Sequence, residues 1–102
     1  MLDKQARPRS MNVDAAEGLA IDALGFLAAH EDEFLRFLAL SGLTVGELRA
    51  AAGDGNFLAG VLDFVMGNER TLLSFAAHAG IDPSRVGAAR QALAGAYGVS
   101  AE

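Results

Sequence analysis

Few side chains of this chain could perform acid–base or metal chemistry, and two of them are its histidines. His30 lies three residues before Glu33, so a shared helix face would present an imidazole beside a carboxylate, two groups that bind metal ions. A metal site needs more ligands, and no His-Glu-x-x-His or Glu-x-x-His pattern occurs. His30 and His78 both lie near predicted helix ends, where the helix dipole favours an imidazolium. We therefore interpret both histidines as structural and predict no metal site.

The sequence also lacks the motifs of other catalytic and ligand-binding sites. The chain has no cysteine, which excludes thiol nucleophiles, disulfides and thiolate metal sites. The glycine-containing stretch at 53–60 lacks the lysine of a phosphate-binding loop, and Leu58 stands where a calcium loop needs an oxygen ligand. No serine stands in the motif of an activated nucleophile. The sequence predicts a protein that is not an enzyme and that uses no cofactor.

Two charged residues stand among apolar positions of the predicted helices. Glu17 lies toward the edge of the apolar arc of the first helix, and Arg90 lies on the inward face of the last. One hypothesis is that they pair with each other or with another carboxylate, such as Asp63 or Glu69. The alternative is that each side chain extends along the apolar surface and places its charge in water.

These side chains belong to a chain whose apolar residues recur with helical periodicity, and no stretch alternates for long enough to predict a strand. Helices are expected at about 13–29, 32–40, 45–52, 57–66, 69–79 and 83–97. The connections are only two to four residues long by this assignment, so neighbouring helices must pack closely. The predicted fold class is all-α: a compact bundle of five to six short helices with the first at the centre.

The predicted helix boundaries carry capping signals. Thr44 and Glu47 have the spacing of a capping box, and Gly42 is expected to end the preceding helix in the left-handed conformation. Asp14 predicts a capping box for the first helix, with Asn12 as a competing N-cap. The residues on the weakly apolar side of that helix are nearly all small, which favours the close approach of another helix; the alternative is that they face water.

Length and composition bound the domain organisation. With 102 residues the chain is expected to form one domain over 12–98, preceded by a disordered tail at 1–11 and followed by a frayed end at 99–102. Hydrophobic residues make up 52% of the chain, and three predicted helices have apolar arcs wider than a small bundle can bury. Surplus apolar surface is typical of an interface. The sequence therefore predicts a protein-interaction module with a protein partner or a second copy of itself.

A DNA-binding regulator is the alternative prediction, carried by segment 34–52. There a helix ends at Gly42 and a second begins after a tight turn, as in a degenerate helix-turn-helix. Leu38 stands where that motif usually has a small residue, and the second helix offers only Arg49 and Glu47 to read bases. The net charge of −5 also repels phosphate backbones, so nucleic acid is the less favoured partner.

The first 30 residues contain no uninterrupted apolar run that would serve as a signal-peptide core or a membrane span. No membrane association is predicted, and the expected location is the cytoplasm.

Three stretches resemble a family of short bacterial proteins that is classed as a domain of unknown function. They are AEGLAIDALGFLA at 16–28, FLRFLALSGL at 34–43 and NFLAGVLDFVMGNERTLLSFA at 56–76. The resemblance covers about 14–93, and it implies a compact helical fold in a bacterial cytoplasm. It transfers no active site.

Asp63, Asn68 and Glu69 are the most polar positions within those stretches. Together with Glu17 and Arg90 they form the candidate polar cluster that the sequence predicts.

Overall fold

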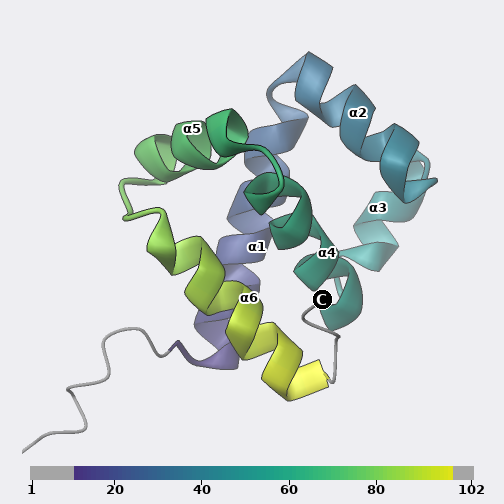
Figure 1. Cartoon of the computed structure of the whole chain (residues 1–102). Coiled ribbons are helices and arrows are strands. Elements are labelled where there is room, and N and C mark those ends of the chain that lie inside the picture. Colours follow the sequence, from purple (N-terminus) through teal and green to yellow (C-terminus); the bar gives the residue numbers. More distant parts are fainter. Residues whose placement is uncertain (1–10, 98–102) are drawn as a thin grey trace, which may run out of the picture.

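The computed structural model describes residues 11–97, which form six helices and no strand (Figure 1). The helices are α1 (Val13–Ala28), α2 (Glu31–Ser41), α3 (Val45–Ala51), α4 (Gly55–Met66), α5 (Glu69–Ala79) and α6 (Ser84–Tyr97). The predicted all-α fold is therefore confirmed. The predictions for 1–10 and for the chain after 97 lie outside the described residues. Met11, assigned to the tail by the sequence, is half-buried and packs against the core.

Helices α1, α4 and α6 form the centre of the molecule, with each packing against the other two. In Figure 1 α6 crosses in front of α1, and α4 lies beside both. The buried faces combine small and large side chains: Leu27, Leu62 and Leu93 are fully buried, and alanines fill the positions between them. Helices α2 and α5 also contact α1, so the predicted central position of the first helix is confirmed.

The weakly apolar side of α1 does not receive another helix, and that part of the prediction is wrong. Ile21 is 49% exposed, and all the small or polar residues beside it are exposed too. They are Ala15, Gly18, Asp22, Gly25 and Ala29. The buried residues of α1 are Ala16, Ala20, Ala23, Phe26 and Leu27, a narrower stripe than the apolar arc that the sequence predicts.

Local hydrogen bonds decide where the helices begin and end. The side chain of Asn12, not that of Asp14, caps α1 by accepting from the Ala15 N–H at 2.7 Å, which corrects the predicted capping box there. The capping box of Thr44 and Glu47 at the start of α3 is confirmed. Gly42 ends α2 with a φ of 74°, the left-handed conformation that glycine adopts without strain.

None of the helices within residues 11–97 is both long enough and apolar enough to cross a membrane.

We expect the substitution Leu62→Ala to lower the free energy of unfolding by about 2–5 kcal/mol, because a fully buried leucine leaves a cavity when truncated. The matched control is Leu73→Ala, since Leu73 is 48% exposed and its loss should cost about 0.5 kcal/mol or less. Chemical denaturation monitored by circular dichroism measures both. Equal losses for the two variants would contradict the described packing.

Candidate functional site

Two cavities lie along one face of α2, one near each end of the helix. The cavity near its N-terminus has a volume of about 620 Å³ and a polar lining. His30 and Glu33 line it from the start of α2, and Arg70, Ser74 and His78 line it from α5. We call this space the polar cavity.

The second cavity, of about 400 Å³, lies between the C-terminal half of α2 and α4. Its lining is largely apolar, and we call it the apolar groove. The residues that line it are Phe37, Leu40, Ser41, Phe57, Gly60, Asp63 and Phe64. Phe37 contacts Phe57 and Phe64 with its ring edge-on to each, which attaches this half of α2 to α4.

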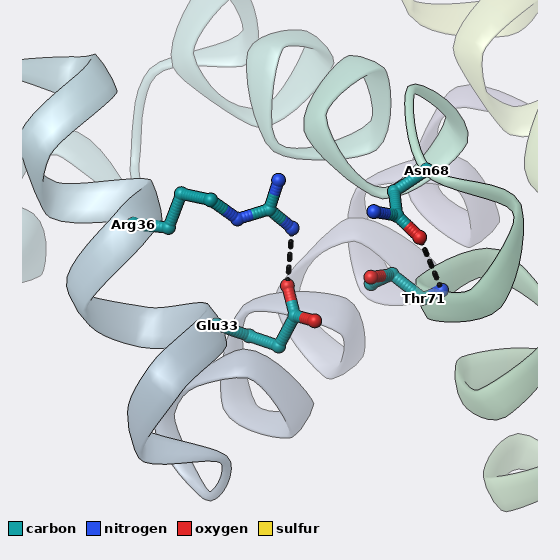
Figure 2. A network of polar contacts seen from close by, with 4 residues as sticks. All are labelled: Glu33, Arg36, Asn68 and Thr71. Carbon is teal, nitrogen blue, oxygen red and sulfur yellow. Dashed lines mark hydrogen bonds and ion pairs between the residues drawn. The ribbon is translucent and has the colours of Figure 1, made fainter.

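A short polar network lies between α2 and the start of α5 (Figure 2). The Arg36 guanidinium donates to the Glu33 carboxylate at 2.6 Å, and it also lies 4.9 Å above the ring of Phe64. Across from them, the Asn68 side chain caps α5 by accepting from the Thr71 N–H at 3.1 Å. Figure 2 shows that Glu33 and Thr71 approach each other between α2 and α5.

The Arg36 side chain holds the pKa of Glu33 below its ordinary range by hydrogen bonding. The Thr71 hydroxyl and the charge of Arg70 act in the same direction, and partial burial of Glu33 opposes them. Glu33 is therefore an ionised carboxylate at neutral pH whose charge is compensated by Arg36.

The two histidines lie on either side of one phenylalanine. The ring centroids of His30 and His78 are 4.3 and 5.3 Å from that of Phe26, and His30 Nδ1 donates to the Phe26 carbonyl oxygen at 2.8 Å. The structure thus brings together two residues that the sequence treated as unrelated. Within the described part of the chain, no group of three or more His, Cys, Asp or Glu side chains has the arrangement of a metal site.

A signal for the polar cavity was present in the sequence but was not used. Arg70, Ser74 and His78 are spaced four residues apart, which places them on one stripe of a helix. His30 and Glu33 have the same kind of spacing. Nothing in the sequence shows that these two stripes face each other.

The residues of the predicted polar cluster serve three different roles. Arg90, 8% exposed, donates from Nε to Asp63 at 2.6 Å, so the pairing hypothesis is confirmed for these two residues. Glu17 instead accepts a hydrogen bond from the Tyr97 hydroxyl, an interaction that raises the pKa of Tyr97. Asn68 caps α5, and Glu69 lies exposed in its first turn. A cavity of about 270 Å³ is lined by Asp63 and Arg90 but not by the other three residues.

The helix-turn-helix hypothesis rests on α2, the turn at Gly42 and α3. In the structure α3 is a single short helix, and the Glu47 side chain is engaged in its capping box. Arg49 on α3 is exposed. DNA binding stays a prediction.

These features define a small all-helical domain with two cavities beside α2. The chain matches, over residues 13–96, the model of a family described as Protein of unknown function (DUF3572), and it belongs to that family. No curated protein and no solved structure matches the chain.

We expect the substitution Arg36→Gln to raise the pKa of Glu33 toward its ordinary value, because the hydrogen-bonded cation that lowers it is lost. A carboxyl whose pKa is lowered by folding stabilises the fold above the unfolded pKa of about 4.3 and loses this contribution as the pH falls through the folded value. Carboxyl-detected NMR titration of both proteins measures the pKa. The control is Arg49→Gln, and an unchanged pKa in Arg36→Gln would contradict the described ion pair.

We expect the substitution Asp63→Asn to destabilise the protein by about 1–3 kcal/mol, because the largely buried Arg90 side chain loses its anionic partner. The matched control is Asp22→Asn, which removes an exposed aspartate of α1 and should change stability by about 0.5 kcal/mol or less. Thermal unfolding followed by circular dichroism compares the two. Equal midpoints for Asp63→Asn and the parent protein would show that the ion pair contributes nothing.

Proposed function

We propose that this domain is a protein-interaction module that associates with a second copy of itself through the apolar groove. The observation that carries the proposal is Leu40, which lines the groove and is nevertheless 72% exposed. A leucine left this open beside three phenylalanines is typical of a surface that a partner covers.

The groove has room for an inserted side chain. Gly60 of α4 lies in its wall, and a Cβ placed on Gly60 would meet no atom within 4 Å. Phe57 and Phe64 lie on the same helix and are only partly buried. An apolar side chain that entered beside Gly60 would therefore be surrounded by aromatic carbon, the environment that favours its transfer from water.

A second copy supplies such a side chain by symmetry. In a two-fold dimer the same patch occurs on both partners, so Leu40 of each copy can enter the groove of the other. Val45, the first residue of α3, is another exposed large apolar residue.

The charges at the groove also suit a two-fold arrangement. Arg36 and Asp63 flank it, with side chains that are 45% and 53% exposed. A two-fold axis can bring the cation of one copy toward the carboxylate of the other, which gives complementary charges across the interface. Because each copy carries a net charge of −5, the overall repulsion should decrease as salt screens it.

Three features that accompany this proposal rest on the sequence. The bacterial origin and cytoplasmic location implied by the resemblance stay predictions, as does the absence of an enzymatic activity.

We expect the substitution Leu40→Lys to weaken dimerisation by about tenfold or more, because a charged side chain cannot be buried in the groove without a partner. The control is Leu35→Lys: Leu35 is also exposed, also on α2 and outside the groove, and its replacement changes the net charge equally. Sedimentation equilibrium gives the dissociation constant of each protein.

A second variant, Gly60→Leu, fills the groove from inside and should also weaken dimerisation. A parent protein that stays monomeric up to about 1 mM would overturn self-association, since specific dimers form well below that concentration. An equal effect of Leu35→Lys and Leu40→Lys would overturn the assignment of the interface to the groove.

A further inference from the structure

We propose that the polar cavity binds a small organic phosphate, with Arg70 as the principal contact and His30, Ser74 and His78 as further hydrogen-bond partners. This site is distinct from the apolar groove, and the proposal does not depend on dimerisation.

The polar cavity lacks the acidic excess of the whole chain. The chain has a net charge of −5, yet Arg36, Arg70 and both of its histidines gather here. The opposing acids are Glu33, and Asp22 in an adjoining cavity of about 410 Å³ that shares Phe26 and both histidines. The two arginines and the two carboxylates balance in formal charge, so the attraction for an anion comes from the Arg70 guanidinium and the hydrogen-bonding groups around it.

Arg70 is the cation that remains available to a ligand. Glu33 is the carboxylate nearest to the described arginines of this cavity, and it forms its ion pair with Arg36. Arg70 is close enough to lower the pKa of Glu33, but it forms no ion pair within 4.0 Å among residues 11–97. A guanidinium without a carboxylate partner at a cavity wall can offer two parallel N–H groups to a phosphate.

The other hydrogen-bonding groups reach the cavity from two sides. Ser74 and His78 follow Arg70 on the same stripe of α5, and His30 approaches from the junction of α1 and α2. The Nδ1–H of His30 is occupied by the Phe26 carbonyl, so Nε2 of the neutral ring is an acceptor, which suits the P–OH group of a monoanionic phosphate. A tetrahedral phosphate can accept hydrogen bonds from several directions, whereas a planar carboxylate accepts mainly within its plane.

One buried hydroxyl group supports the binding of a polar ligand in this cavity. Thr71 is only 2% exposed and lines the polar cavity, and its hydroxyl has no hydrogen bond of regular geometry, although it lies near Glu33. Figure 2 shows the Thr71 hydroxyl turned toward α2 rather than along its own helix. Buried hydroxyls are normally hydrogen-bonded, so a small adjustment on ligand binding would satisfy this one.

The volume and one wall of the cavity indicate an organic ligand rather than inorganic phosphate alone. The space of about 620 Å³ falls within the range of small-molecule sites. Phe26 is buried, and the exposed imidazoles of His30 and His78 that contact it form an aromatic wall on which a flat ring can stack.

The test is a titration of the ¹⁵N-labelled full chain with phenyl phosphate, followed by ¹H–¹⁵N correlation spectra. Concentrations up to about 20 mM cover the millimolar affinity expected of so small a ligand. We expect saturable shifts at the amides of the cavity residues, and weaker binding of inorganic phosphate, which lacks the ring. Benzoate, which has the ring and a carboxylate, should bind at least about tenfold more weakly than phenyl phosphate.

Arg70→Gln is the decisive variant, and we expect it to weaken phenyl phosphate binding by at least about tenfold. Arg49→Gln is the matched control, because it removes an exposed arginine outside the cavity and should leave the affinity unchanged. The spectra themselves report that each variant is folded. Absence of saturable shifts in the parent chain, equal affinity in Arg70→Gln, or equal affinity for benzoate would each overturn the proposal.

Discussion

The close contact of α1, α4 and α6 is the constraint on which the rest of the structure depends. Alanines of α1 and α6 and Ala59 of α4 are fully buried where these helices meet, and their small side chains let the backbones approach. The large side chains that fill the remaining space, such as Leu27 and Leu93, come from the same three helices. Larger residues at the alanine positions would force the helices apart, since a packed interior has no room for extra volume.

This centre leaves little space for α2. Its contacts are with the end of α1 and, through Phe37, with the aromatic rings of α4, so only Phe37 of α2 is fully buried. The two cavities follow directly from this placement, because α2 bridges over α4 and α5 at a few points and does not pack along them. The polar network around Glu33 and Arg36 is one of those points.

The two cavities differ in what they can recognise. Aromatic carbon and an exposed leucine suit a protein surface, whereas an arginine, two imidazoles and two hydroxyls suit an anion. Both cavities lie within the stretch that the DUF3572 family model covers. Arg36 contacts Glu33 at the polar cavity and Phe64 at the apolar groove.

The sequence by itself determined the six helices, most of their ends and the apolar stripes, since these depend on interactions within a few residues of each other. Thr44 with Glu47, Gly42 and the periodicity of α4 are examples. It also raised two possibilities for Arg90, pairing with a carboxylate or extension of its charge into water. Only the tertiary structure decided that the partner is Asp63 rather than Glu17, that one side of α1 faces water, and that His30 and His78 share Phe26. These outcomes depend on how successive helices are oriented relative to one another by the short connections between them. Helical periodicity in the sequence carries no information about those orientations.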